Sequence, residues 1–372
     1  MRGKIAHLTT VHHPFDPRIF HKQLKSLRDA GYEAHLVAPH ERSQTVDGVS
    51  VVALPEVNGR YRRILLQGSV YRAARALDAD CYHFHDPELI PVGYLLKKST
   101  GARVIYDMHE NYWWHGPLEG RFIRAFERWC FRWVDHVVVA NSSQVGIPQA
   151  SNCPNTVIKN YSKCSEPERA SEKGRAKALS FPVRLIYAGV NSEDRGLFNL
   201  IDLAFRVQKG RMESQVEIVG ICNREVQRKR AKRQIQQLNI DNHVLSLVGW
   251  DQFVPWRELM SRCQRAHVGL ILWNSTPHHL ETIPTKFFQY MNCGLPILCS
   301  DFPRWRRFVE THSCGAVVPP GDVDAAVRVL KRWQSNPDEY RALSAAAREA
   351  SEQYRWKEMG DRLVRLYDEL LV

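Results

Sequence analysis

Short apolar runs alternate with amphipathic stretches through the first third of the chain. The strand-like runs are IAHLTTV, EAHLVAP, VSVVALP, CYHFHD, RVIYDMH and HVVVAN, and a helical stretch, FHKQLKSLRDAG, separates the first two. Strands separated by helices predict a parallel sheet with crossover connections, which is an α/β domain. Ligands of such sheets bind at the carboxyl ends of the strands, so we expect residues 11–18, 85–88 and 107–110 to lie on one rim.

The alternation starts again after a polar segment. Residues 162–182 are charged and short of large apolar side chains, as interdomain linkers are. Beyond them the strand-like runs are VRLIYAG, QVEIVG, VLSLVGW, HVGLILW and LPILCS. We predict two Rossmann-like domains that face each other across a cleft, at 1–165 and 178–350. A last helix at 351–372, with large side chains at helical spacing, is expected to pack on the first domain.

Composition narrows the classes of protein. The chain has 372 residues, 44% of them apolar, which suffices for two cores. It has neither an apolar run of about 18 residues nor a secretory signal at its start, so we expect a cytoplasmic protein, with the inner face of the membrane as a further possible location. Nine scattered cysteines indicate reduced thiols. A net charge of +12 favours an anionic partner without naming it.

One segment, residues 281–303, sets a carboxylate, a cation and an amide at fixed offsets ahead of a strand-like run. A helix that begins near Pro284 places Lys286 and Gln289 three residues apart on one face, beside the positive helix N-terminus. Phosphate groups bind at such helix ends. The glycine and proline that follow end the helix, and residues 297–301 predict a short core strand. We expect a site for a polyhydroxylated, phosphorylated ligand here.

This segment resembles the nucleotide-sugar site of glycosyltransferases with two Rossmann-like domains (GT-B), especially family 4, the glycosyl transferases group 1. The resemblance implies that Glu281 contacts the donor-sugar hydroxyls, Lys286 a phosphate and Gln289 the ribose hydroxyls. The family carries a second glutamate where this chain has Gln289. An amide can still accept one hydroxyl bond and donate another, without charge-assisted strength. Some inverting bacterial glucuronosyltransferases of this architecture show Lys-x-x-Gln, so the departure leaves the stereochemistry open.

A second candidate donor-binding segment is the loop AGVNSEDRG at residues 188–196, between a predicted strand and a helix. Backbone amides and an arginine in such a loop are suited to binding an anion. The resemblance assigns Gly189 and Arg195 to the donor diphosphate, while Val190 stands where many members have a second arginine. Taken alone, the string also fits a structural turn with a solvated arginine. Its occurrence in one domain with Glu281 and Lys286 favours the donor site.

In the first domain, HDPEL and YDMHEN end two strand-like runs, and clustered histidines and carboxylates suit proton transfer or hydroxyl binding. By resemblance, His109 faces the donor sugar, and we assign His85, Asp86 and Glu110 to the acceptor. For each histidine taken alone, a hydrogen-bonded structural role is an equal alternative. His85, Asp86, Asp107 and His109 could also supply nitrogen and oxygen ligands to a metal ion. Their spacing matches no tight metal motif and GT-B enzymes do not generally need a bound metal, so we expect none.

The opening string TTVHHPFDPRIFHK also matches a string that recurs in one subgroup of the family. We assign His13, Asp16 and Arg18 to acceptor binding. The alternative is that Arg18 pairs with Asp16 and caps the following helix.

Two stretches, 60–77 and 120–134, mix arginines with large apolar side chains. An aromatic stripe at helical spacing is more typical of a core than of a membrane anchor. The arginines beside it would suit an anionic membrane surface, so peripheral membrane association stays a candidate property. The basic run at 228–233 reads most simply as a solvated helix face.

Together these features predict a metal-independent, hexosyltransferase-type glycosyltransferase without a cofactor. We expect it to take a sugar from a UDP- or GDP-linked donor and to deliver it, with retention, to a glycan or lipid-linked acceptor in cell-envelope or exopolysaccharide biosynthesis. An inverting glucuronosyltransferase-like enzyme would need Asp107 or Glu110 as general base. A nucleotide-sugar epimerase would convert the donor alone. A basic nucleic-acid-binding protein is the third alternative, but no helix-turn-helix, zinc finger or RNP string appears, so no nucleic-acid partner is expected.

Overall fold

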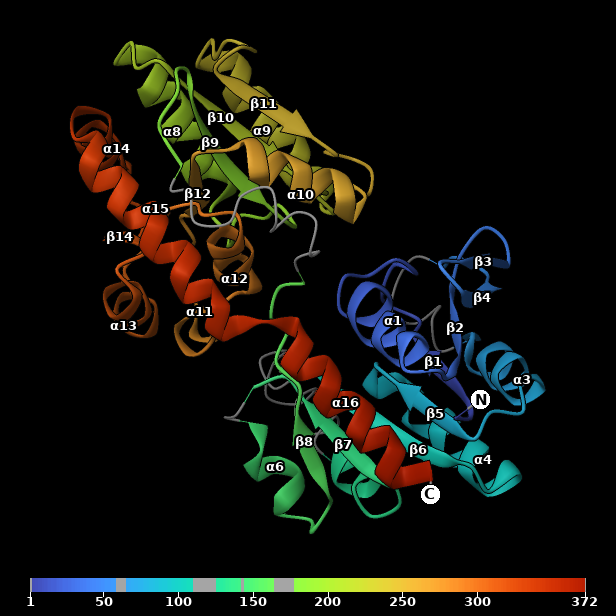
Figure 1. Ribbon diagram of the computed structural model, residues 1–372. Helices are drawn as coiled ribbons and strands as arrows, with labels where there is room; N and C mark the ends of the chain where they lie inside the picture. Colours follow the sequence, from blue (N-terminus) through green and yellow to red (C-terminus); the bar gives the residue numbers. More distant parts are fainter. Residues whose placement is uncertain (1, 58–64, 110–124, 142–143, 164–176, 372) are drawn as a thin grey trace. The chain divides into compact units, whose positions relative to one another are not determined.

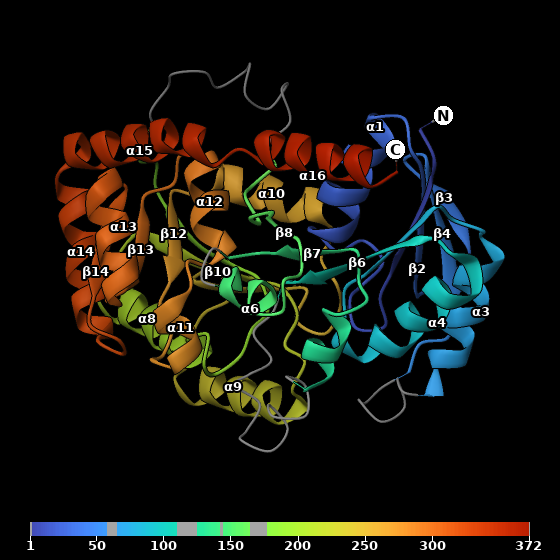
Figure 2. The ribbon, with the colours of Figure 1, turned by 90° about the horizontal axis from the view of Figure 1, so that it is seen from below.

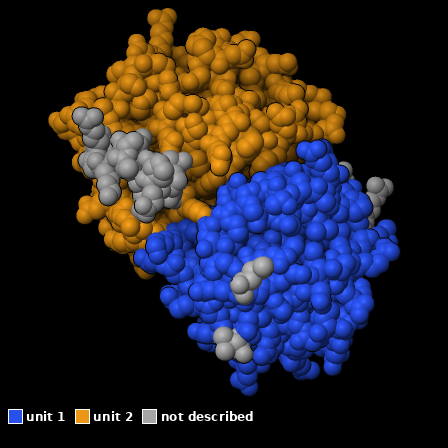
Figure 3. Space-filling model, turned by 45° about the vertical axis from the view of Figure 1, so that its right-hand side comes forward, with its two compact units in different colours: residues 1–160, 356–372 blue, residues 161–355 orange. Residues whose placement is uncertain are grey.

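The computed structural model describes residues 2–57, 65–109, 125–141, 144–163 and 177–371. The chain forms two compact units, coloured separately in Figure 3. Unit 1 consists of Met1–Asn160 and Trp356–Val372, and unit 2 of Tyr161–Arg355. The unit boundaries thus fall at 160/161 and 355/356. Most of the expected linker lies outside the described residues.

Unit 1 is built on an eight-stranded sheet in the order β3-β4-β2-β1-β5-β6-β7-β8. All neighbouring strands are parallel except β3 and β4. The strands are β1 (Lys4–Leu8), β2 (Glu33–Pro39), β3 (Gln44–Val46), β4 (Val49–Leu54), β5 (Cys81–Phe84), β6 (Arg103–Met108), β7 (His136–Val139) and β8 (Asn155–Val157). The helices are η1 (Ile19–Leu24), α1 (Lys25–Asp29), α3 (Gln67–Ala76), η2 (Pro87–Leu89), α4 (Ile90–Thr100), α6 (Gly146–Gln149) and α16 (Trp356–Leu371).

The alternation along β1 and β5 separates an apolar face of this sheet from a polar one. Leu8, Tyr82 and Phe84 point into the hydrophobic core under α3 and α4. His7 and His83 are equally buried but point to the opposite face, because successive strand residues alternate. On that face lie α1 and α16 (Figures 1 and 2). The fold therefore places a row of buried histidines beneath the last helix.

The last helix, α16, belongs to unit 1. The Trp356 indole donates a hydrogen bond to Ser26 Oγ at 2.9 Å, and the Tyr32 hydroxyl donates one to Asp368 at 2.8 Å. A side chain at Gly360 would press against Ser26 Oγ at 3.0 Å, so glycine permits a close helix approach. The buried face of this helix is formed by Trp356, Met359, Gly360, Leu363, Leu366 and Tyr367.

Unit 2 has a wholly parallel six-stranded sheet in the order β11-β10-β9-β12-β13-β14. Its strands are β9 (Val183–Ala188), β10 (Ser214–Val219), β11 (Leu245–Val248), β12 (Val268–Ile271), β13 (Ile297–Ser300) and β14 (Gly315–Val318). Its helices are α8 (Leu197–Lys209), α9 (Glu225–Gln237), α10 (Trp256–Arg265), α11 (Pro277–Glu281), α12 (Thr285–Asn292), α13 (Pro303–His312), α14 (Val323–Ser335), α15 (Pro337–Ser351) and η5 (Glu352–Tyr354). The two parallel α/β units confirm the predicted Rossmann-like fold.

Two further expectations concern the side chains and the helices. The eight cysteines within the described ranges are all buried thiols without a disulfide. None of the described helices has the length and apolar character needed to cross a bilayer.

Candidate active site

In unit 2, three glycines let the loop between β9 and α8 lie close to neighbouring segments: Gly189 and Gly196 in the loop itself, and Gly220 directly after β10. Gly189, at φ +140°, has no room for a Cβ because the Lys286 amine lies there. A Cβ on Gly196 would overlap the carbonyl of Leu272, and one on Gly220 would overlap that of Gly189. This close backbone approach brings the β9–α8 loop, the end of β12 and helix α12 together.

Lys286 lies in the first turn of α12, which begins after Pro284 as the sequence predicts. The side chain is buried, with 7% exposed, and its amine lies 5.1 Å from the ring centre of Tyr187 and 5.2 Å from that of Trp273. Burial, and then the nearby charge of Arg195, lower the pKa of Lys286 to about 7. A buried cation of this kind gains most from an anionic ligand that replaces its lost hydration.

Arg195 and Lys286 both lie near the aromatic ring of Trp273. The guanidinium carbon of Arg195 lies 5.4 Å from the ring centre of Trp273. The other contacts of Trp273 hold it in place, because His279 packs at 4.5 Å and Trp305 at 5.5 Å. Within the described part of the chain, neither cation forms an ion pair with a carboxylate. Two positive charges beside a glycine loop can therefore hold the two phosphates of one ligand.

The remaining donor residues stand as follows. Gln289 lies one turn beyond Lys286 on α12 and is 8% exposed. Glu281 is the last residue of α11, and its side chain lies outside what the structure describes. The structure thus brings Gly189, Arg195 and Lys286 together.

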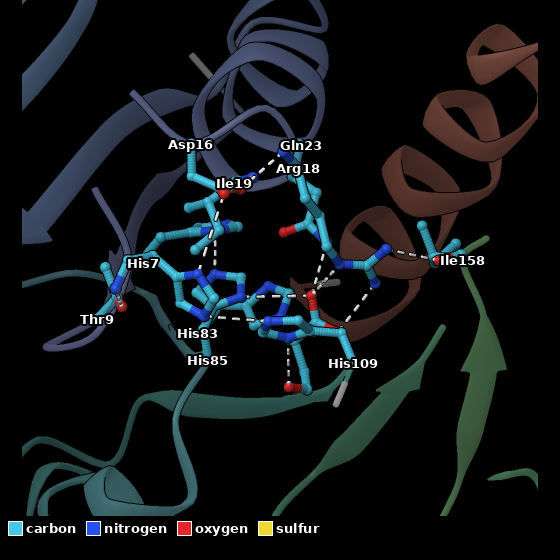
Figure 4. A network of polar contacts seen from close by, with 12 residues as sticks. His7, Thr9, Asp16, Arg18, Ile19, Gln23, His83, His85, His109 and Ile158 are labelled. Atoms are coloured by element: carbon cyan, nitrogen blue, oxygen red, sulfur yellow. Dashed lines mark hydrogen bonds and ion pairs between the residues drawn. The ribbon is translucent and has the colours of Figure 1, made fainter. Parts of the chain in front are cut away.

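In unit 1, Asp107 at the end of β6 is the centre of a buried polar network, and Figure 4 labels its partners Arg18, Gln23 and His85. Arg18 binds this carboxylate through Nε and Nη2, both at 2.9 Å, and Gln23 donates to it at 2.8 Å. Burial alone would raise the pKa of Asp107, but Arg18, His109 and the hydrogen bonds to the carboxylate hold it well below its usual value. An anion held so firmly is a poor general base, which weakens the assignment of Asp107 to that role in an inverting reaction.

Arg18 is therefore a structural partner of Asp107 in this fold. It is 4% exposed, and its Nη1 also donates to the carbonyl of Ile158 at 2.9 Å. The Arg18 guanidinium does not pair with Asp16. Instead, Oδ1 of Asp16 accepts the backbone amides of Arg18 at 2.7 Å and Ile19 at 3.0 Å, which starts the helical segment η1. The alternative weighed above, an Arg18–Asp16 pair, is wrong in its partner, although Asp16 does bind the start of the helix.

Asp86 and His85, at the end of β5, are buried rather than surface groups. Asp86 Oδ2 accepts hydrogen bonds from the Thr9 hydroxyl at 2.9 Å and the Thr10 amide at 2.6 Å. Its Oδ1 accepts no hydrogen bond among the described residues and lies 3.5 Å from Nε2 of His12. His85 is 1% exposed and lies 3.3 Å from Asp107. Direct acceptor contact by His85 and Asp86 stays a prediction, and their burial gives both an evident structural role.

Among the residues expected on the rim, His109 has ring nitrogens in a geometry that suits contact with a ligand. Its Nδ1 lies 3.1 Å from the backbone carbonyl of Asp107, to which it donates, so Nε2 carries the lone pair. Nε2 of His12 approaches that atom at 3.1 Å. His13, which the sequence analysis had selected, is exposed, and its Nδ1 accepts the Phe15 amide at 3.1 Å. Glu110 lies outside the described residues.

Two clusters could hold a metal ion by distance: His7, His83 and His85, and His85, Asp107 and His109. Most of the nitrogen atoms in these clusters already lie at hydrogen-bond distance from a protein partner. These hydrogen bonds are sufficient to explain how the histidine rings are positioned. Metal independence stays a prediction.

Several site residues were missed by sequence reasoning. His12 lies within the expected rim at 11–18 but was not assigned a role, because only the turn of the loop decides whether it or His13 points inward. Gln23 and Tyr367 follow helical spacing and read as ordinary helix residues. Trp273 ends a strand-like run, where an aromatic residue signals a core. No local pattern marks any of them as part of a site.

Comparison with known proteins identifies the class. Residues 18–158 match the model of a glycosyl transferase 4-like domain, and residues 172–350 match that of glycosyl transferases group 1. The two matches lie in sequence on either side of the boundary between the units. The chain therefore belongs to the family 4-like glycosyltransferases of the GT-B type, and it is an enzyme.

Individual relatives agree with that class. The amylovoran biosynthesis glycosyltransferase AmsK of Erwinia amylovora is 26% identical over 200 residues, which are 54% of this chain and 47% of the relative. The match thus spans about half the length of that curated relative. Among solved structures, sucrose-phosphate synthase of Thermosynechococcus elongatus has a TM-score of 0.72 at 15% identity, with 99% of this chain and 98% of that chain covered. Anabaena HepE in complex with UDP-glucose has a TM-score of 0.69 at 12% identity, with 99% and 100% covered.

Proposed function

We propose that this glycosyltransferase transfers a sugar from a nucleotide-diphosphate donor to a glycan or lipid-linked acceptor in exopolysaccharide or cell-envelope biosynthesis. The observation that carries the proposal is the pair of cations, Lys286 and Arg195, over Trp273 beside Gly189. Two relatives support it by name: one acts in amylovoran biosynthesis, and one was solved with UDP-glucose. We propose a UDP- or GDP-linked donor.

In this proposal, Lys286 and Arg195 stabilise the diphosphate as it leaves. Negative charge on the leaving group grows in the transition state, and preorganised cations in a poorly hydrated site oppose that growth most effectively. Lys286 is already buried and held over two aromatic rings, so little reorganisation is needed. Glu281 and Gln289 are assigned to the donor-sugar and ribose hydroxyls. The site's own cations take the place of a divalent metal ion.

We propose a retaining reaction, in which the leaving phosphate itself accepts the proton of the acceptor hydroxyl. His109 is assigned to a hydroxyl of the donor sugar, which would take the place of Nε2 of His12 beside the accepting Nε2 of the His109 ring. His12 orients that ring from the opening loop. No carboxylate of unit 1 has to act as base in this scheme, which agrees with the fully engaged state of Asp107.

An inverting reaction is the second candidate because of one observation. Oδ1 of Asp86, which accepts no hydrogen bond among the described residues, lies 3.5 Å from Nε2 of His12. A carboxylate at this distance can orient an imidazole, so His12 would be the general base of that scheme in place of Asp107 or Glu110.

Anionic membrane association is proposed for an aromatic and basic surface of unit 1. Leu95 is 51% exposed, Phe126 50% and Trp129 38%, so part of the stripe at 120–134 lies outside the core. Tyr94 and Trp129 pack at 5.0 Å, and the amine of Lys98 lies 5.9 Å from the Tyr94 ring. Exposed aromatic rings beside cations suit the boundary of an anionic bilayer. Co-sedimentation with anionic but not neutral vesicles, weakened by Phe126→Glu, tests this surface.

The function is tested with labelled UDP- and GDP-sugars and membrane extracts as the source of acceptor, with and without EDTA. We expect one donor to give a labelled glycan or lipid, undiminished by EDTA, with the α-linkage of the donor retained. A β-linked product that disappears in His12→Gln would replace retention by inversion. Conversion of the donor to another nucleotide sugar without an acceptor would identify an epimerase and contradict the proposal.

A further inference from the structure

A chain of buried polar groups joins the last helix of unit 1 to Asp107. The Tyr367 hydroxyl lies 3.0 Å from Nε2 of His7 and 2.8 Å from Nδ1 of His83. Nδ1 of His7 lies 2.9 Å from Nε2 of His85, and Nδ1 of His85 lies 3.3 Å from Oδ2 of Asp107. All five side chains are at most 1% exposed. The groups must therefore satisfy one another.

The chemistry at the two ends sets the direction of every proton. Asp107 is ionised and can only accept, so His85 carries its proton on Nδ1 and accepts at Nε2. His7 must then donate from Nδ1 to His85 and accept at Nε2. The single proton of Tyr367 goes to His7, so its oxygen accepts from Nδ1 of His83. All three histidines are thus protonated on Nδ1, in one continuous chain of donors and acceptors.

Burial keeps the chain neutral along its length. It lowers the pKa of His7 and of His83 well below the ordinary value, and a neighbouring histidine adds to the effect in each case. Burial also lowers the pKa of His85, against the opposing influence of Asp107. A neutral imidazole has one donor and one acceptor, which is what each link requires. Among the described residues, Nε2 of His83 has no hydrogen-bond partner, and Nδ1 of His85 meets Asp107 as an ion-pair contact at 3.3 Å rather than as a regular hydrogen bond.

We propose that Tyr367 is a positioning residue for glycosyl transfer: through His7 and His85 it holds Asp107 in the orientation that His109 requires. Asp107 lies two residues before His109, and its backbone carbonyl accepts the Nδ1–H of that ring at 3.1 Å. Its side chain is held on one side by Arg18 and on the other by His85. A tilt of Asp107 therefore moves His109. The inference rests on the proposed contact of His109 with the donor sugar.

The variant Tyr367→Phe removes one oxygen atom and keeps the aromatic ring on the buried face of α16. It leaves His7 without a donor and His83 without an acceptor. We expect kcat to fall about tenfold, a size typical of small misplacements of a catalytic group. The KM for the donor and the binding of nucleotide diphosphate should change little, because unit 2 holds the phosphates.

A matched control removes another tyrosine hydroxyl that is bonded to the same helix. Tyr32→Phe removes the hydrogen bond to Asp368 of α16 but leaves the histidine chain intact. We expect a lower Tm and an unchanged kcat for this variant. If Tyr367→Phe also lowered only the Tm, Tyr367 would be a structural residue and the proposal would fail.

Nuclear magnetic resonance of ¹⁵N-labelled histidines tests the proton arrangement without any sugar donor, so its result is independent of the proposed function. We expect His7, His83 and His85 to be neutral and protonated on Nδ1. Tyr367→Phe should shift the signals of His7 and His83 and leave those of His136, a half-buried histidine hydrogen-bonded to Thr156, unchanged. Protonation of His7 or His85 on Nε2 would contradict the chain. Ring nitrogens that gain a proton only after treatment with EDTA would also contradict the chain, because a metal ion would then have occupied the position of the proton.

Discussion

The Lys286 amine occupies the space beside Gly189 that any larger side chain at that position would need. Gly189→Ala should therefore displace Lys286 and strain a backbone at φ +140°. We expect nucleotide-diphosphate affinity to fall at least tenfold, measured by isothermal titration calorimetry. Gly321→Ala is the control for strain alone, because Gly321 also has a positive φ but no atom near its missing Cβ. Equal affinities for the two variants would show that Lys286 does not need this space.

Lys286 gives the donor site a pH dependence. Its pKa is lowered to about 7 by burial and by Arg195, so a large fraction of the free protein is uncharged there at pH 8. A diphosphate beside it favours the charged form and raises the pKa again. Binding at pH 8 should then take up a proton, which appears as a dependence of the calorimetric enthalpy on the buffer's ionisation enthalpy. Little uptake is expected at pH 6, where Lys286 already carries its proton in the free protein. Equal proton uptake at pH 6 and pH 8 would place the titrating group elsewhere.

Lys286 should lower the stability of the fold although ligand binding requires it. Unfolded lysine keeps its proton to near pH 10.5, whereas folded Lys286 loses it near pH 7, so folding releases a proton between these values and the free energy of unfolding rises with pH there. Below pH 7 both states are protonated and the full cost of burying the charge remains. Lys286→Met removes that cost, and we expect a Tm higher by about 2–4 °C per kcal/mol gained, together with lost ligand binding. Lys331→Met, at an exposed position of α14, should change neither quantity. A lower Tm for Lys286→Met would contradict the buried-charge argument.

Arg18 and Asp107 form a buried bidentate pair whose loss should be costly. Arg18→Met leaves the carboxylate unpaired, and we expect the free energy of unfolding to fall by about 3–5 kcal/mol at pH 7, measured with urea. The pKa of Asp107 is depressed in the wild type, so its contribution is present above about pH 4 and is lost as the pH falls through the folded value. The difference between wild type and variant should therefore shrink in acid. Arg28→Met, at a partly exposed pair with Asp29, should cost less than about 1 kcal/mol. A difference that persisted at low pH would point to lost packing instead of the charge.

Local rules were enough for the donor segment. The start of α12 after Pro284, the strand that follows it and the loop with Gly189 and Arg195 all depend on caps, turns and periodicity within about twenty residues. The two α/β sheets follow from the same patterns. The positions of Lys286 and Arg195 could therefore be predicted from the local sequence. Their role in donor binding was inferred from the resemblance to the family.

Contacts between distant segments were not predictable. The ring of Trp273 lies beside Arg195 only because β12 and β9 are neighbours in the sheet. The partners of Tyr367 lie 284 and 360 residues away, so nothing near this residue signals its role. For Arg18 the nearest acid in sequence, Asp16, was the natural guess, whereas the fold supplies Asp107 across the sheet. Sequence patterns reveal which residues carry chemistry more readily than which partners they meet.

The central claim is that Lys286 and Arg195 bind the diphosphate of a sugar donor. The most direct measurement is thermal stabilisation of the wild type, Lys286→Met and Arg195→Met by UDP, GDP and their sugars. Binding to the folded state alone raises Tm by mass action. The account predicts a selective rise with one nucleotide and its sugar in the wild type, reduced in Arg195→Met and absent in Lys286→Met. An equal rise in all three proteins, or none in the wild type with any nucleotide, would contradict it.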